Sequence, residues 1–217
     1  MHLNPIGLPK TKELVKKKFQ LAVVTLDLKF GKQITDEARK RGIEAKLYES
    51  LDRVPLSTDA VVVRRNEYDE VLSEKMFVAN LQSSPRSIVD KAIETGYRKK
   101  KVAKATVVID PGKKTGAAYF ADDILLRTET YFSNEPLIDD VAEFFSNHPE
   151  AQQLVLVGEG APDFRQTLIE QLVEKIPGLS TENIITVPER NSSKLAGGKD
   201  EIAATIISWT RRKQKRI

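Results

Sequence analysis

Three acidic residues in the C-terminal half of the chain each lie at the edge of an apolar element. Asp110 and Glu159 each close an apolar, strand-like run, and Asp200 opens an apolar, helix-like run. A carboxylate beside buried side chains costs free energy unless a cation or a hydrogen-bond donor compensates it. Three carboxylates brought together would repel one another, and their oxygen atoms suit Mg²⁺ or Mn²⁺. The three acids therefore predict a divalent-metal site.

The residues around these acids fit a phosphate substrate. Asp110 is followed by Pro-Gly-Lys-Lys-Thr-Gly, which places Lys113 and Lys114 near it, and Glu159 lies between Gly158 and Gly160, which have no side chain to block a phosphate backbone. Each acid also has a structural explanation. Asp before Pro-Gly initiates turns, an acid between glycines suits a loop, and Asp is a favourable N-cap. The metal-site hypothesis rests on all three positions together.

The elements that must position these acids follow a definite order. Apolar runs and turn residues predict an antiparallel meander of three strands, and a stripe of apolar residues with helical spacing predicts the helix that comes next. Alternating strands and helices complete the half. The expected ranges are strands 105–110, 116–120 and 124–132, helix 136–146, strand 154–159, helix 163–175, strand 184–187 and helix 200–210.

This order resembles the ribonuclease H-like fold over residues 104–212, and it is most similar to the RuvC-like group that includes the Holliday-junction resolvases. The motif that carries the resemblance is Ile109-Asp110-Pro111-Gly112 followed by Thr115-Gly116, with Glu159 and Asp200 in the matching later positions. The resemblance implies a metal-dependent phosphodiesterase acting on structured DNA or RNA, with Asp110, Glu159 and Asp200 as its catalytic and metal-binding residues. In such chemistry two Mg²⁺ or Mn²⁺ ions activate the water and stabilise the leaving oxygen.

One position departs from the RuvC-like pattern. Those enzymes usually carry a fourth acid one helical turn after the last one, where this chain has Ala203. Glu201, beside Asp200, and Asp163, just beyond Glu159, are the candidate substitutes. The number of metal ions is therefore open.

The first half predicts a small β/α layer, so that the whole chain is expected to be α/β. Apolar runs at 20–26, 43–48 and 59–65 predict parallel strands, with a helix at 32–41 that Gly42 terminates. The expected organisation is a small N-terminal β/α domain with a basic arm (1–83), a connecting helix (84–103, with helical spacing from Ser84 to Lys101) and a ribonuclease H-like domain with a basic tail (104–217).

The charge of the chain is unevenly distributed. Its net charge is +4, but lysines and arginines cluster at 16–18, 98–101 and 211–216. Such clusters fit a polyanionic partner, although solvated lysine runs are common. The expected nucleic-acid contacts are Lys113, Lys114, Lys194, Lys199, Arg211, Arg212 and Lys213.

Composition excludes several classes of protein. The chain has no cysteine and two histidines, which rules out disulfides and thiolate metal sites and disfavours a histidine-rich zinc site. No apolar run approaches the ~20 residues that span a bilayer, and the first residues do not have the layout of a signal peptide. We therefore expect a cytoplasmic protein with no membrane association. Paired cutting by RuvC-like enzymes suggests a homodimer, by resemblance only.

Three functions remain open from the sequence. The first is a RuvC-like nuclease. The second is a nucleic-acid-binding protein with weak or no catalysis, which Ala203 favours. The third is a sugar-kinase or actin-like ATPase, because Asp110-Pro-Gly-Lys-Lys-Thr-Gly also resembles the first phosphate-binding hairpin of that superfamily, although those proteins need two such domains.

Overall fold

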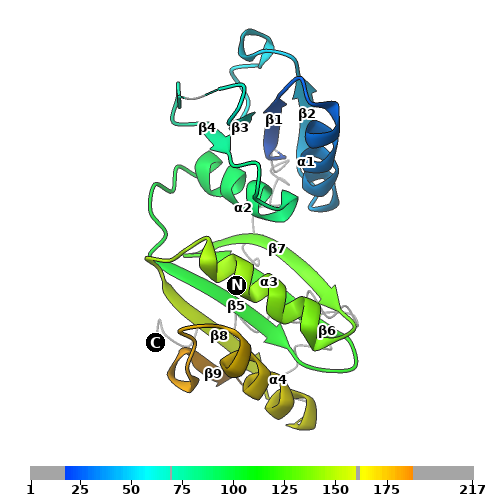
Figure 1. Ribbon diagram of the computed structural model, residues 1–217, viewed down its shortest axis with the longest axis vertical. Helices are drawn as coiled ribbons and strands as arrows, with labels where there is room; N and C mark the ends of the chain where they lie inside the picture. The colour runs from blue at the N-terminus through cyan, green and yellow to red at the C-terminus, as the bar shows by residue number, and fades with distance from the viewer. Residues whose placement is uncertain (1–17, 69, 160–161, 188–217) are drawn as a thin grey trace, which may run out of the picture.

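The chain forms an α/β structure with two β-sheets, one above the other in Figure 1. The computed structural model of the 217 residues describes residues 18–68, 70–159 and 162–187. No helix within these ranges is long and apolar enough to span a membrane.

The N-terminal sheet is entirely parallel and has the strand order β2-β1-β3-β4. Its elements are β1 (Gln20–Val24), α1 (Leu28–Lys40), β2 (Glu44–Tyr48), the 3₁₀ turn η1 (Leu51–Arg53), β3 (Ala60–Arg64) and β4 (Met76–Ala79). The three parallel strands expected from the sequence are confirmed. The fourth, β4, was not predicted, because a run of four residues is too short to be distinguished from a loop by its pattern.

Helix α1 begins earlier than its sequence pattern predicts. The Asp27 side chain accepts a hydrogen bond from Phe30 N at 3.0 Å and so caps a helix that begins at Leu28, four residues before Lys32, the expected start. The helix ends as predicted, because Gly42 has a φ of +75°, a left-handed conformation that glycine adopts without steric cost.

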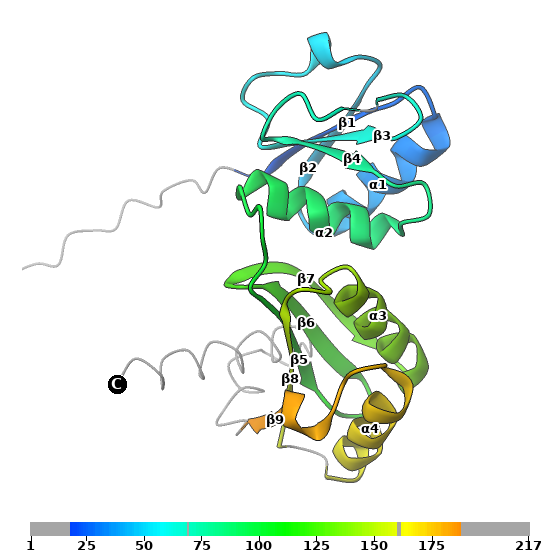
Figure 2. The same ribbon diagram turned by 60° about the vertical axis from the view of Figure 1, so that its left-hand side comes forward.

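The C-terminal sheet is mixed and has the order β7-β6-β5-β8-β9. Its elements are β5 (Lys104–Asp110), β6 (Thr115–Ala121), β7 (Ile124–Tyr131), α3 (Asn134–Ser146), β8 (Gln152–Gly158), α4 (Pro162–Lys175), the 3₁₀ turn η2 (Thr181–Asn183) and β9 (Ile184–Val187). β5, β6 and β7 form the expected antiparallel meander, and β8 and β9 continue the sheet in parallel with β5. Helices α3 and α4 pack on the same face of this sheet (Figure 2).

Helix α2 (Pro85–Gly96) lies between the two sheets in both views (Figures 1 and 2). It is shorter than the helix expected from Ser84 to Lys101, because the chain turns out of the helix at Arg98, which has a φ of +57°. Helix α2 does more than connect the N-terminal and C-terminal sheets, because its side chains Ile88 and Val89 are buried in the core. Gly96 allows close packing here, since a Cβ at this position would come within 2.4 Å of the Phe19 ring.

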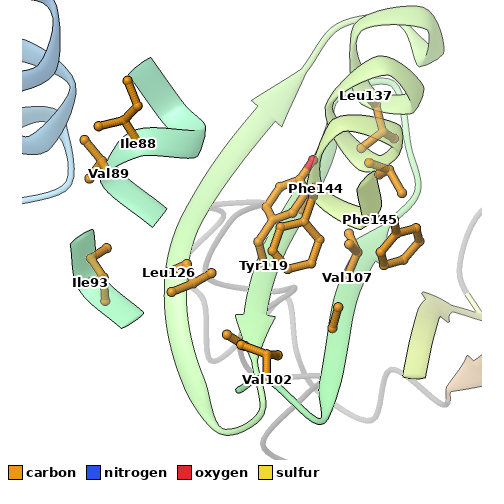
Figure 3. Packing of buried hydrophobic residues seen from close by; sticks show 14 of the residues in the cluster. Ile88, Val89, Ile93, Val102, Val107, Tyr119, Leu126, Leu137, Phe144 and Phe145 are labelled. Carbon is orange, nitrogen blue, oxygen red and sulfur yellow. The ribbon is translucent and has the colours of Figure 1, made fainter. Parts of the chain in front are cut away.

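One apolar cluster runs from the N-terminal sheet through α2 into the C-terminal sheet. In Figure 3, Ile88, Val89 and Ile93 of α2 lie on one side of β7, and Tyr119 with Phe144 of α3 lies on the other. The Tyr119 and Phe144 rings meet edge to face, with centroids 5.3 Å apart. The two sheets are therefore joined by shared core packing.

Buried charges also join the two halves of the molecule. Asp90 of α2 accepts hydrogen bonds from Arg41, which follows α1, at 2.5 Å and from Arg127 of β7. Arg41 also pairs with Glu37 at 2.6 Å. All four side chains are at least nine-tenths buried, so each charge depends on the others for compensation.

Candidate functional site

Two of the three predicted acids end neighbouring strands at one edge of the C-terminal sheet. Asp110 is the last residue of β5, and Glu159 follows the last residue of β8. The two strands are parallel, and Ile109 pairs with Val157, so the register places Asp110 beside Gly158 and Glu159 one residue further on. Parallel pairing in this register thus brings both acids to the same end of the sheet.

The alternation of β5 decides which face Asp110 occupies. Ala105, Val107 and Ile109 belong to the core under α3 and α4, whereas Val108 belongs to a second apolar cluster on the opposite face. Because side chains alternate along a strand, Asp110 shares the face of Val108. Its side chain is half-buried there.

Glu159 is held at the strand end by its backbone. Its N–H donates to the carbonyl oxygen of Val187 on β9 at 3.0 Å, and its own carbonyl accepts from the Arg165 guanidinium of α4. The Glu159 side chain is exposed. Its backbone is therefore fixed between β9 and α4 while the carboxylate faces solvent.

The β5–β6 hairpin carries the two lysines expected to contact phosphate. Lys113 and Lys114 are both exposed, and the Lys114 ammonium lies 5.6 Å from the centre of the Phe132 ring. Phe132 directly follows β7, so β6 and β7 together place an aromatic ring beside the hairpin cations.

A pocket of about 380 Å³ opens beside this hairpin. Its walls come from four places in the chain: the hairpin, the end of β7, the start of α3 and the first turns of α4. The lining residues are Gly112, Lys113, Thr115, Phe132, Ser133, Asn134, Asp163, Phe164 and Thr167. Phe132 and Phe164 are 77% and 48% exposed, so the pocket presents two aromatic surfaces to solvent next to cations.

Buried hydrogen bonds hold the pocket wall formed by β7 and α3. The Tyr131 hydroxyl donates to Asp140 of α3 at 2.5 Å and lies 2.8 Å from the Tyr119 hydroxyl. Arg86 of α2 donates to both carboxylate oxygens of Asp140, at 2.7 and 2.6 Å. Burial raises the pKa of Tyr131 far above its usual value, so the phenol stays a neutral donor. These hydrogen bonds therefore hold the junction between β7 and α3, where Phe132 lies, in a fixed position.

The structure describes five of the predicted site residues: Asp110 and Glu159 end neighbouring strands, Lys113 and Lys114 follow Asp110 in the β5–β6 hairpin, and Asp163 lines the pocket with Lys113. Asp163 lies in the first turn of α4 and lines the pocket. The other predicted residues lie outside the described ranges: Asp200, Glu201, Lys194, Lys199, Arg211, Arg212 and Lys213.

The acids that the structure describes at this edge, Asp110 and Glu159, offer carboxylate oxygens, which suit a hard cation such as Mg²⁺ or Mn²⁺. Within the described ranges, no group of three acidic, histidine or cysteine side chains is placed to hold a metal. Asp110 and Glu159 are two members of the expected set of three, and the third, Asp200, belongs to residues 188–217.

The two aromatic residues of the pocket were not predicted from the sequence. Phe132 was assigned to the end of a strand, and Phe164 was expected in the buried stripe of its helix with Leu168 and Leu172. Those two leucines are buried, but Phe164 is half exposed. It lies in the first turn of α4, which extends beyond the core, and the pattern alone does not show where the core ends.

Comparison of the chain with protein-family models, with curated proteins and with solved structures finds no match in any of the three. The function must therefore be argued from the geometry of the site.

Proposed function

We propose that the chain is a divalent-metal-dependent nuclease of the ribonuclease H-like, RuvC-like type, which cleaves phosphodiester bonds in structured DNA or RNA. The observation that carries the proposal is the register of β5 and β8, which brings Asp110 and Glu159 to the same end of two neighbouring parallel strands. The strand order β7-β6-β5-β8-β9, with three antiparallel strands followed by two parallel ones, supports it, since the resemblance implies this order.

The side chains around the acids support a phosphate-containing substrate. Lys113 and Lys114 supply positive charge at the hairpin, and exposed Phe132 and Phe164 supply flat apolar surfaces on which unpaired bases stack. A substrate with unstacked nucleotides, such as a branch point or a single-stranded end, would use both features. An intact duplex, whose bases are stacked, would contact only the two lysines.

Asp110, Glu159 and Asp200 would hold Mg²⁺ or Mn²⁺ as oxygen ligands. When bound, such ions activate water and stabilise the leaving oxygen of the phosphodiester. The protein's own part is to place the carboxylates at the strand ends and to orient the phosphate through Lys113 and Lys114. The proposal requires the three carboxyl groups to lie within about 8 Å of one another, because oxygen ligands reach such ions at ~2.1 Å.

A nucleic-acid-binding protein without catalysis is the second candidate. Ala203, where a fourth acid would stand, favours it, because fewer ligands would leave a second ion weakly held. The ATPase alternative has less support. In an ATPase of this type, the N-terminal sheet would have to serve as the second phosphate-binding domain. The described strands of that sheet are all parallel and include no antiparallel hairpin like the one that follows Asp110.

The test compares wild type with Asp110→Asn on four-way junctions, duplex DNA and RNA–DNA hybrids, with Mg²⁺, Mn²⁺ or a chelator. Asparagine keeps the shape of the side chain and removes its charge, so metal-dependent cleavage should fall by about two or more orders of magnitude with the fold intact. Asp123→Asn is the matched control, since Asp123 lies 78% exposed in the β6–β7 turn at the other end of the sheet. Cleavage that survives both chelator and substitution would refute this site. Binding without cleavage by wild type would support the second candidate.

A further inference from the structure

The outer edge of β4 borders a second pocket, of about 440 Å³, far from the acidic edge. It lies between β4, the loop that precedes β4 and the C-terminal end of α2. Lys100, in its wall, comes just before β5, whereas Asp110 ends β5, so the two sites are at opposite ends of that strand. Nothing in the proposed nuclease activity uses this pocket.

The hydrogen-bonding groups on the outer edge of β4 have no strand partner within the described ranges. Val61 N–H donates to Lys75 O at 2.7 Å and Arg65 N–H donates to Ala79 O at 3.2 Å, so every second residue of this segment faces β3. Val78 alternates with them, and its backbone N–H and C=O point away from the sheet. An exposed edge of this kind is a template for another strand.

The two faces of this edge differ in character. Met76 and Val78 lie on the face of an apolar cluster, near Val71, which is 61% exposed. On the other face, α2 and its exit supply Lys91 and Arg98. A strand added beside β4 would therefore meet apolar side chains on one face and cations on the other.

The pocket carries an excess of positive charge. Lys91 is paired with Glu94 at 2.9 Å, and Lys100 makes an exposed contact of 3.3 Å with Glu74. Arg65 and Arg98 have no carboxylate partner in the described part of the chain, and both side chains are exposed. Two unpaired guanidiniums bordering one groove favour an acidic ligand, which they can bind in a bidentate manner.

Arg98 occupies a position that normally belongs to glycine. Its N–H donates to Thr95 O and the next N–H donates to Glu94 O, both at 2.9 Å, which closes α2 in a Schellman motif. Helix α1 closes with the same two bonds, but the left-handed residue there is Gly42. An arginine at +57° carries a steric cost that glycine avoids. Strain of this kind points to a role for the side chain, and the Arg98 side chain lines the pocket.

We propose that this pocket docks an extended acidic segment of a partner protein, which adds as a strand beside β4. Its backbone pairs with Val78, alternate acidic side chains bind Arg98 and its neighbours, and the apolar side chains between them cover Val71 and Val78. The chain's own terminal segments do not complement the pocket, because basic residues outnumber acidic ones in both 1–17 and 188–217. A nucleic-acid backbone would use the cations but neither the strand edge nor the apolar face.

The test uses the full chain and a fluorescein-labelled peptide of about eight residues in which Glu and Val alternate, a length typical of one strand. Binding is followed by fluorescence anisotropy and by hydrogen exchange at the Val78 amide. The key variant is Arg98→Gly, which should raise the melting temperature by about 2–4 °C because the strain is relieved. The same variant should weaken peptide binding by roughly tenfold. A gain in stability together with a loss of binding cannot come from misfolding.

Gly42→Ala is the matched control at the end of α1. Alanine is strained at a φ of +75°, so this variant should lose stability and keep its affinity for the peptide. A Lys–Val peptide should not bind, and protection of the Val78 amide should appear only with the Glu–Val peptide. The proposal is overturned if the peptide does not bind or if Arg98→Gly leaves its affinity unchanged. It is also overturned if an oligonucleotide of equal charge binds through Arg98 in place of the peptide.

Discussion

At the scale of single residues, the candidate site places an acid and two lysines in one short stretch of chain. Asp110 ends β5, Lys113 and Lys114 follow it in the hairpin, and the Lys114 ammonium lies over the Phe132 ring. The carboxylate proposed to bind metal and the cations proposed to bind phosphate are thus separated by one turn. This spacing explains why the hairpin motif fits both a nuclease and a phosphate-binding loop.

Replacing Lys113 and Lys114 with glutamine should reduce the salt dependence of nucleic-acid binding. Each phosphate contact releases counterions, so the slope of log K against log salt should become shallower by about 1 for each lysine that contacts a phosphate. The loss of affinity should be similar for all base sequences. Fluorescence anisotropy between low and moderate salt measures both quantities.

The control replaces Lys29 and Lys32 with glutamine. These lysines are also exposed but belong to α1, which packs on the N-terminal sheet. An identical change in slope for both double variants would mean that the hairpin lysines contribute only general charge.

At the scale of elements, α2 and α3 are joined by a buried pair. His148, which follows α3, has Nε2 at 2.8 Å from the Glu94 carboxylate of α2 and Nδ1 at 2.8 Å from the Phe144 carbonyl. Both ring nitrogens therefore face acceptors, which favours the protonated ring. Burial lowers the pKa of His148, but these two hydrogen bonds outweigh it and the pKa is raised.

This pair predicts a limited pH window of maximal stability. Because the folded pKa of His148 lies above the unfolded value of about 6.5, its stabilisation is complete below that pH and is lost as the pH rises through the folded value. Burial raises the pKa of Glu94, but hydrogen bonds from His148 and Lys91 outweigh it and the pKa is lowered. The stabilisation from Glu94 is therefore present above about pH 4.3 and lost as the pH falls.

Urea unfolding across the pH range should show this behaviour, and His148→Gln should flatten the decline above about pH 6.5. Glu150→Gln is the control, since Glu150 is an exposed acid beyond the end of α3 that pairs with Lys101 at 3.2 Å. If the unfolding free energy of His148→Gln declines above about pH 6.5 as steeply as that of wild type, another group is responsible for the decline.

At the scale of the whole molecule, the two sheets share one core and one buried charge cluster around α2. Asp90→Ala would leave the guanidiniums of Arg41 and Arg127 buried without their shared carboxylate. We expect a loss of about 3–5 kcal/mol in unfolding free energy, because breaking a buried ion pair leaves uncompensated charge. Unfolding of wild type should be a single transition, since the apolar cluster is continuous across α2.

The comparison for this prediction is Glu150→Ala. The Lys101–Glu150 pair has side chains 73% and 77% exposed, and exposed pairs contribute less than about 1 kcal/mol. A similar loss from both substitutions would show that burial does not set the cost. Two separate transitions in wild type would show that the sheets unfold independently.

Much of the secondary structure follows from the sequence, because local spacing suffices for it. The meander, the helix after it and β9 were all expected from apolar runs and turn residues, and β9 at 184–187 matches its expected bounds. Element ends were less accurate where a side-chain cap or a backbone conformation decides them, as at Asp27 and Arg98. Asp110 and Glu159 were identified because an acid closing an apolar strand is visible in the sequence.

Only the tertiary structure decides which distant residues and strands become neighbours. The register of β5 against β8 places Asp110 and Glu159 at one edge, and no local pattern specifies the pairing of strands about fifty residues apart. The same holds for the exposure of Phe132 and Phe164, and for the position of β4 at the end of the described N-terminal sheet. The physical reason is that propensity and periodicity act over neighbouring residues, whereas burial and pairing depend on contacts between distant ones.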